Sequence, residues 1–222
     1  MDAKVEIDAA LKAVGEPLAH DSAHLHVSGR ASYTDDIPEP RNLLHVAVGM
    51  SSVAHADLLR VDLSAVESRE GVVGVCVATD IEGVNDFGPI VKGDPILADG
   101  RVHYVGQAVF AVAAETVDAA RKAARLAEIE YRELEPVLDP LTAVEKASFV
   151  LPSETLERGD PAGVLAAAPH RLSRRLHLGG QDQFYLEGHI AMAVREDDGG
   201  LLVYSSTQHP DEVQMLVAHA TG

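Results

Sequence analysis

Hydrophobic and polar residues begin to alternate regularly near residue 43, and the pattern predicts strands separated by short helices. Residues 43–49 form an apolar run of strand length, and residues 59–63 alternate between apolar and charged, as a half-exposed strand does. A third strand is predicted at 72–78, where a longer apolar run indicates a buried strand. The only cysteine, Cys76, lies in this run, so we expect it to act as a small buried hydrophobic residue.

A short helix is predicted between the second and third strands. Ser64 and Glu67 have the spacing of a capping box, in which each side chain accepts a hydrogen bond from a backbone N–H at the start of a helix. The helix is therefore expected to begin at Ala65. Gly71 can end it, because glycine adopts the left-handed backbone conformation without steric cost. These segments make one strand–helix–strand unit.

A second unit of the same kind follows a glycine- and proline-rich loop at residues 80–100. Strands are predicted near residue 102 and at 108–114, with a bend at Gly106 between them. Thr116 can cap the next helix, whose apolar stripe keeps helical spacing and consists of Val117, Ala120, Ala124 and Ala127. Alternation over 128–132 predicts the strand that completes the unit.

Two such units predict a compact domain of the mixed α/β (α+β) class, with helices packed on one sheet. We place this domain at residues 25–135, after a polar N-terminal arm at residues 1–24. His24 and His26 would share one face of a strand at the end of the arm. The sequence places no third ligand beside them, so we predict no metal site there.

The remaining residues divide into a connector and the start of a second domain. Several prolines interrupt residues 136–170, where only 162–168 is expected to form a helical turn or two. In residues 171–222, leucines at 172, 176 and 178 predict a strand, and further strands are predicted at 190–194 and 201–205, joined by a Gly-containing turn. Pro210 can begin a final helix with the apolar stripe Val213, Leu216, Val217 and Ala220. Three strands and one helix cannot readily bury a core, so this domain is expected to be incomplete.

Composition narrows the functional classes. The 222 residues carry a formal net charge of −17 without a local basic cluster, so nucleic acid and anionic membranes are excluded as predicted partners. The N-terminus has no apolar core of signal-peptide length and no run approaches the length of a membrane span, so we expect a cytoplasmic protein. A single cysteine excludes a disulfide framework and any iron–sulfur cluster held by this chain alone. Motifs of nucleotide-binding loops and of serine hydrolases are absent.

The segment Gly179–Glu187, with the sequence GGQDQFYLE, is the main candidate for chemistry. Two consecutive glycines followed by polar residues are typical of a hairpin or bulge between strands. The same glycines would also let a bulky ligand approach the backbone closely, and the Gln181 carboxamide could then donate hydrogen bonds to an anionic oxygen. From the residues alone, both interpretations stay open.

This segment resembles the first active-site segment of the molybdenum subunits of xanthine dehydrogenases and aldehyde oxidases. Further resemblances occur in the same order along essentially the whole chain, in the segments GEPL (15–18), SGRASYTDDIP (28–38), AHA (54–56), VGQ (105–107) and STQ (206–208). The resemblance implies that residues 25–135 form the small "hammerhead" domain and that a molybdopterin-binding domain begins at 171. It places Gly180 and Gln181 at the cofactor, with Gln181 beside an oxygen ligand of the molybdenum.

By this resemblance, the parent protein hydroxylates xanthine or hypoxanthine to urate with an oxygen atom derived from water. The electrons would pass to iron–sulfur and FAD groups on partner subunits, since the position of Met1 resembles the multi-subunit bacterial arrangement. The family's catalytic glutamate, second glycine-rich cofactor segment and substrate-binding arginine would lie beyond Gly222. We therefore expect this chain alone to bind no molybdopterin, to be inactive, and to associate into oligomers.

Two residues near the motif need separate interpretation. Glu187 is expected to be a structural carboxylate, or one that supports the residues around the cofactor, rather than the catalytic base. Gln208 is either near the cofactor or simply a residue at the entry of the last helix. Two alternatives to a xanthine dehydrogenase also remain at this stage: an oxidoreductase of the same family acting on aldehydes or other heterocycles, and a non-catalytic interaction or scaffold module.

Overall fold

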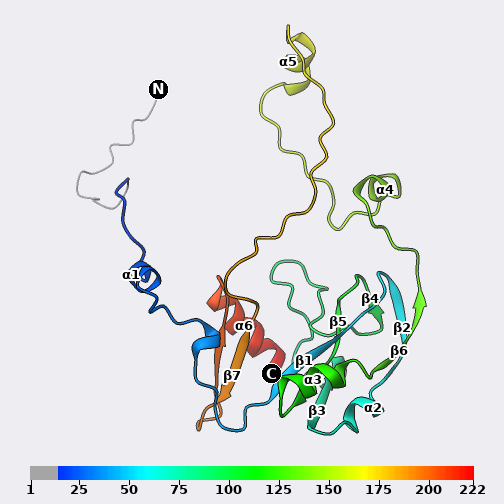
Figure 1. Cartoon of the computed structure of the whole chain (residues 1–222). Helices are drawn as coiled ribbons and strands as arrows, with labels where there is room; N and C mark the ends of the chain where they lie inside the picture. Colours follow the sequence, from blue (N-terminus) through cyan, green and yellow to red (C-terminus); the bar gives the residue numbers. More distant parts are fainter. Residues whose placement is uncertain (1–14) are drawn as a thin grey trace. The chain divides into compact units, whose positions relative to one another are not determined.

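A computed structural model describes residues 15–222 (Figure 1), so most of the predicted N-terminal arm lies outside the described residues. The chain divides into two compact units. The larger unit contains Pro40–Gln183 and His209–Gly222, and the smaller one combines the described residues up to Glu39 with Phe184–Gln208. Each unit therefore contains residues that are far apart in the sequence.

The larger unit contains two three-stranded sheets in which every pair of neighbouring strands is antiparallel. The first sheet has the spatial order β1 (His45–Met50), β5 (Ala108–Ala114) and β3 (Val72–Val77). The second has the order β4 (Arg101–Val102), β2 (Ala56–Asp62) and β6 (Glu128–Glu133). The strands predicted between residues 25 and 135 form, but the prediction of one sheet is wrong.

The two helices of the predicted units connect one sheet to the other. Helix α2 (Ser64–Glu67) follows β2 of the second sheet and leads to β3 of the first, while α3 (Val117–Ala124) leads from β5 to β6. Strand β3 lies at a sheet edge, where Val73 is 59% exposed, so its predicted burial on both faces is wrong. Cys76 is only half-buried; this burial, aided by the Asp80 carboxylate, raises the pKa of its thiol.

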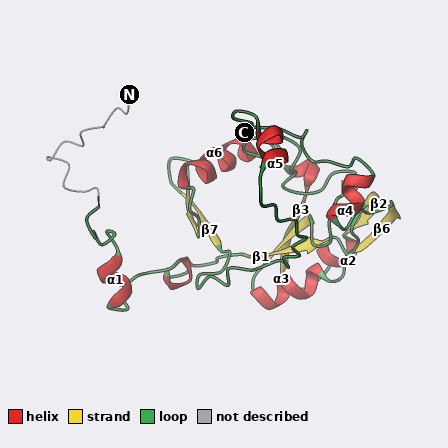
Figure 2. Ribbon diagram, turned by 90° about the horizontal axis from the view of Figure 1, so that it is seen from above, coloured by secondary structure: helices red, strands yellow, loops and turns green. Residues whose placement is uncertain are grey.

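Of the two predicted helix N-caps, that of α3 forms and that of α2 does not. The Thr116 hydroxyl oxygen accepts a hydrogen bond from the Ala119 N–H at 3.1 Å, so α3 begins as predicted. The helix packs on the first sheet (Figure 2), and its Ala120 and Ala123 are buried. The capping box of α2 does not form, because the Ser64 hydroxyl donates to the Asp62 carboxylate at 2.6 Å instead. Gly71 has the predicted left-handed conformation, with φ at +83°.

The core of the larger unit lies between the two sheets and α2 and α3. It is a cluster of buried side chains from both sheets and both helices: Ala56, Leu63, Val66, Ala98, Val102, Val109, Phe110, Val112 and Ala123. Gly49 pairs with the fully buried Phe110 across β1 and β5, and a Cβ at Gly49 would collide with the Phe110 ring. The close approach of strand and ring therefore requires glycine at this position.

Asp57 joins all three strands of the second sheet. It lies on β2, and its carboxylate accepts hydrogen bonds from Arg132 of β6 at 2.6 Å and from Arg101 of β4 at 2.7 Å. The Asp57 side chain is only 13% exposed. The hydrogen bond from Arg132, followed by that from Arg101, lowers the pKa of the Asp57 carboxyl.

The residues at 78–100 form the predicted loop, with one short 3-10 turn, η2 (Ala78–Asp80). Helix α6 (Pro210–Thr221) begins at Pro210 as predicted, and its apolar stripe is half-buried. The loop caps the end of this helix: Gly83 N–H donates to the Ala220 carbonyl at 3.0 Å, and Val84 N–H donates to that of His219 at 2.7 Å. A Cβ at Gly83 would collide with the His219 carbonyl, so glycine is required here too.

The connector contains two short capped helices. Helix α4 (Pro140–Glu145), capped by Asp139, was not predicted, while α5 (Pro161–Ala167), capped by Asp160, was. The strand predicted near residues 172–178 is absent from the described structure, where Leu172, Leu176 and Leu178 are each at least 78% exposed. A strand requires a partner for its backbone hydrogen bonds, and within the described chain this segment pairs with none.

The smaller unit is built on a hairpin and two helical turns. Strands β7 (Ala191–Arg195) and β8 (Leu201–Ser205) pair antiparallel as predicted, and Gly199 in their turn has φ at +90°. Helix α1 (Ala23–Val27) contains His24 and His26, which therefore do not share the face of a strand. A 3-10 turn, η1 (Thr34–Asp36), follows. Among the described residues, no helix has the length and hydrophobicity needed to cross a membrane.

Gly49→Ala should destabilise the protein by about 1–3 kcal/mol, because the added methyl group must displace the Phe110 ring from a close-packed core. Gly74→Ala is the matched control: it also adds a methyl group to a strand of the first sheet, but with no atom within 4 Å. Denaturant unfolding of both variants tests this. Equal stability of the two variants would contradict the packing described for Phe110.

Asp57→Asn should lower thermal stability at neutral pH and reduce its loss in acid. Since the folded-state pKa is lowered, the carboxylate contributes stability above the unfolded pKa of about 3.9, and this contribution is lost as the pH falls through the folded value. Melting temperatures between pH 2 and 7 measure the effect, with the exposed Glu82→Gln as a control of equal charge change. The same acid dependence in Asp57→Asn and wild type would contradict the role of Asp57.

Candidate functional site

The Gly179–Gly180 pair lies in an exposed segment without helix or strand that follows the connector. Neither glycine has a positive φ, and a Cβ at either position would meet no atom within 4 Å. The hairpin or bulge between strands, one of the two interpretations of these glycines, does not form, because residues 171–185 contain no strand. Neither the backbone conformation nor packing within the described residues requires glycine at 179 or 180, in contrast to Gly49 and Gly83.

The side chains that follow the glycines are also exposed. Gln181 presents its carboxamide at the surface, where it can donate two hydrogen bonds and accept others. Phe184 is 96% and Leu186 is 86% exposed, so neither of these apolar side chains is buried within the described residues. Phe184 has φ at +50°, an uncommon conformation for a residue with a side chain. Tyr185 is half exposed, and its ring packs edge-on against His189 with 4.9 Å between ring centroids.

Glu187 connects this segment to a second motif from the start of the chain. Its carboxylate accepts a hydrogen bond from the Thr34 N–H at 2.8 Å, although the two residues are 153 positions apart. Thr34 is the first residue of η1, within the SGRASYTDDIP motif. The structure thus brings two of the sequence motifs together in the smaller unit and gives Glu187 the structural contact predicted for it.

Ser206 of the STQ motif holds the backbone immediately after Glu187. Its hydroxyl donates to the Gly188 carbonyl at 2.9 Å and accepts from the Ile190 N–H at 3.1 Å. Sequence reasoning assigned no role to this serine. Gln208 is exposed and directly precedes His209, the N-cap residue of α6, which agrees with its interpretation as a helix-entry residue.

The VGQ and AHA motifs support the fold of the larger unit. Gln107 is buried, and its side-chain oxygen accepts a hydrogen bond from the His103 N–H at 2.7 Å. Its backbone carbonyl accepts from the N–H of Ser51, which is also buried, at 2.8 Å. His55 stacks on His103 with ring centroids 5.8 Å apart. In the sequence, the indication that Gln107 is buried is its position directly before an apolar strand.

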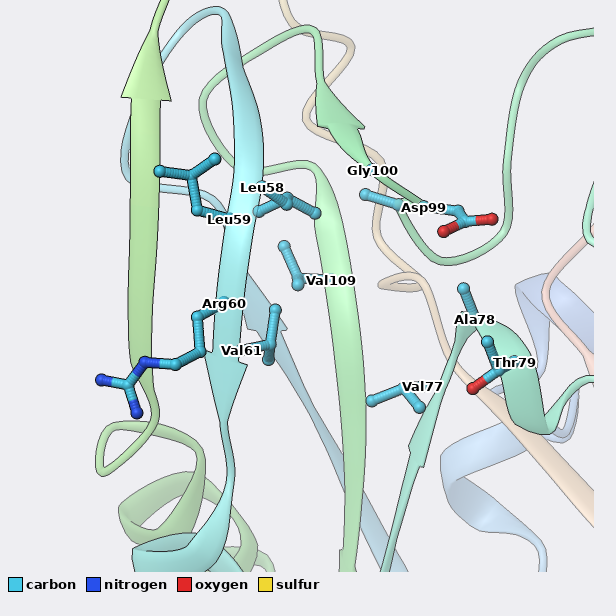
Figure 3. A pocket seen from close by; sticks show the side chains of 11 residues that line it. Leu58, Leu59, Arg60, Val61, Val77, Ala78, Thr79, Asp99, Gly100 and Val109 are labelled. Atoms are coloured by element: carbon cyan, nitrogen blue, oxygen red, sulfur yellow. The ribbon is translucent and has the colours of Figure 1, made fainter.

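A groove of about 340 Å³ opens beside the two sheets of the larger unit (Figure 3). Leu58 and Val61 of β2 and Val109 of β5 line it, together with Val77–Thr79 and Ala98–Gly100. The groove contains none of the motif residues from Gly179 to Glu187. Within residues 15–222, no group of three or more histidine, cysteine or acidic side chains could hold a metal ion.

Comparison with protein families assigns both parts of the chain to one class. Residues 28–135 match the model described as "Aldehyde oxidase and xanthine dehydrogenase, a/b hammerhead domain", and residues 144–222 match the "Molybdopterin cofactor-binding domain". Both the motif segment Gly179–Glu187 and its partner Thr34 lie within these matches. The class is therefore that of proteins in which a hammerhead domain precedes a domain that binds molybdopterin.

Individual relatives identify the family within this class to which the chain belongs. The chain is 37% identical over 210 residues to the xanthine dehydrogenase/oxidase of Gallus gallus and 38% identical over 212 residues to the xanthine dehydrogenase of Drosophila pseudoobscura pseudoobscura. Each alignment covers 94% of this chain but only 15% or 16% of the relative. The aldehyde oxidoreductase of Desulfovibrio gigas shares the fold, with a TM-score of 0.77 over 91% of this chain and 24% of its own, at 24% identity. The chain belongs to the family of xanthine dehydrogenases and aldehyde oxidases.

Proposed function

We propose that this chain is part of the molybdenum-binding subunit of a xanthine dehydrogenase. The complete enzyme hydroxylates xanthine and hypoxanthine to urate, with oxygen derived from water. The observation that carries this proposal is 37–38% identity, along 94% of the chain, to proteins named xanthine dehydrogenase. Since the chain spans about 15% of their length, the activity belongs to a larger protein.

Gln181 and Gly180 are the residues of this chain that we assign to the cofactor. The carboxamide of Gln181 is exposed and uncharged, so it can donate a hydrogen bond to an anionic group that a carboxylate would repel. The open space at Gly179 and Gly180 fits a large group lying against the backbone. When bound, the molybdenum–molybdopterin group supplies the redox chemistry, and the role of the protein residues is to bind and orient this group.

The other components of the reaction must come from elsewhere in the enzyme. One exposed carboxamide cannot hold a cofactor of this size, so we propose that residues 15–222 alone bind no molybdopterin and are inactive. We assign the iron–sulfur and FAD groups that receive the electrons to partner subunits of a cytoplasmic complex. We propose a purine as the substrate. The relatives named xanthine dehydrogenase are more similar in sequence to this chain than the relatives named aldehyde oxidoreductase, which share the fold at lower identity. This difference favours a purine over an aldehyde.

Gln181→Ala in the complete enzyme should lower xanthine turnover by about 100-fold, since one positioned hydrogen-bond donor is lost at the reacting centre. Gln183→Ala is the matched control, because it removes the same side chain two positions away in the same exposed segment. The measurements are molybdenum content and the rates with xanthine, hypoxanthine and aldehydes. A wild-type enzyme that contains no molybdenum, or that oxidises aldehydes but no purine, would overturn the proposed function.

Gly180→Ala should reduce the molybdenum content of the complete enzyme without changing the stability of the described residues. The added methyl group meets no atom of this chain, and the φ of Gly180 is not positive, so no strain arises within the described residues. Thermal unfolding of the chain and metal analysis of the enzyme separate the two effects. A large loss of stability, or full molybdenum content, would show that Gly180 does not serve the cofactor.

A further inference from the structure

The first sheet of the larger unit has an apolar face that is turned away from the core. On β1, Val46, Val48 and Met50 are between 43% and 65% exposed, whereas Ala47 and Gly49 between them face the core. Residues directly opposite one another on paired strands lie on the same face, so the register extends this face across β5 and β3. We call it the outer face; its residues are Val46, Val48, Met50, Gly74, Cys76, Ala111 and Ala113.

The corresponding face of the second sheet is charged. There, Arg60 points away from Leu58 and Val61, which pack against the core (Figure 3). It forms ion pairs with Asp62 at 2.7 Å and with Glu130 at 3.8 Å. An antiparallel sheet with one face in water usually alternates apolar and polar residues along each strand. The second sheet follows this rule and the first does not, so the outer face has the composition of a surface that another element covers.

The size and side chains of the outer face fit an α-helix. Ala111 and Ala113 lie on the central strand, and a Cβ added at Gly74 would meet no atom within 4 Å, so the backbone can be approached closely. Neighbouring strands lie about 4.8 Å apart, so three strands span about 10 Å, which matches the diameter of an α-helix of about 10–12 Å. Helices with an apolar stripe cover sheets in this way in mixed folds.

Most of the protein in which such a helix can occur lies outside the described residues. The alignment with the xanthine dehydrogenase/oxidase of Gallus gallus covers 94% of this chain but only 15% of the relative. Segments of one polypeptide meet at a high effective concentration, which favours a helix of the same subunit over one from another molecule.

We infer that, in the complete enzyme, an apolar helix from the part of the molybdenum-binding subunit outside residues 15–222 packs on the outer face. The outer face is then the surface through which the hammerhead domain is fixed to the rest of its subunit. The inference rests on the proposed function, because it takes this chain to be part of a larger subunit.

Cysteine labelling in the complete enzyme tests this inference. Val46→Cys places a thiol on the outer face, and Glu128→Cys is the matched control on β6 of the second sheet, where the glutamate side chain is 78% exposed. In the native enzyme, Val46→Cys should react with a maleimide at least about tenfold more slowly than Glu128→Cys, since the reagent reaches it only when the covering helix opens. After denaturation the two rates should be equal. Mass spectrometry of the labelled peptides measures both rates.

A charge on the outer face gives a second readout. Val48→Asp should lower the melting temperature of the complete enzyme by several degrees, because it buries a carboxylate without a partner. Leu59→Asp is the matched control: it places the same side chain on a strand of the second sheet, at a leucine that is 53% exposed. Its effect should be much smaller.

Equal labelling of the two thiols in the native enzyme, or equal melting temperatures of the two aspartate variants, would overturn the inference, since the outer face would then be in water. Protection of Val46→Cys that is lost when the enzyme dissociates into single subunits would also overturn it, because another molecule would then cover the face. Molybdenum content and xanthine turnover test the proposed function separately. An enzyme that protects Val46→Cys but contains no molybdenum would overturn the proposed function and leave the covered face standing.

Discussion

The larger unit depends on the packing of one buried surface between two antiparallel sheets. Phe110 lies fully buried on the central strand of the first sheet, and the second sheet contributes Ala56 and Val102 to the same cluster. The helices cross between the sheets rather than staying beside one, so each also closes a side of this core. Apolar burial of this kind is the main source of folding free energy, and the hydrogen bonds of Asp57 to Arg101 and Arg132 add a smaller contribution.

The positions of strands and helices could be predicted from local sequence patterns, whereas the pairing of the strands into sheets could not. Alternation located β2 and β6, and Thr116 marked the start of α3, because these signals act over a few residues. The split into two sheets is decided by contacts between residues distant in sequence, which periodicity does not encode. Ser64 shows the same limit locally, since Asp62 competed successfully for its hydroxyl.

The candidate segment could be proposed from sequence, but its contacts in the fold could not. The GGQDQFYLE segment was identified by its resemblance to a family, and Glu187 was expected to be structural; its partner Thr34 could not be foreseen, because a backbone N–H carries no side-chain signature. The glycines show a related contrast. Packing within the chain explains Gly49 and Gly83, whereas a Cβ at Gly179 or Gly180 would meet no atom within 4 Å, so no contact of the described residues accounts for glycine there.

The interleaving of the two units along the chain has a consequence for the order of folding. Most of the larger unit is made of strands close in sequence, from β1 to β6, so it can form while the chain is still being synthesised. The smaller unit must wait until residues 184–208 have emerged, because the contact of Thr34 with Glu187 closes a loop of 153 residues. The SGRASYTDDIP motif is thus translated early, but its contact with Glu187 can form only after most of the chain has been synthesised.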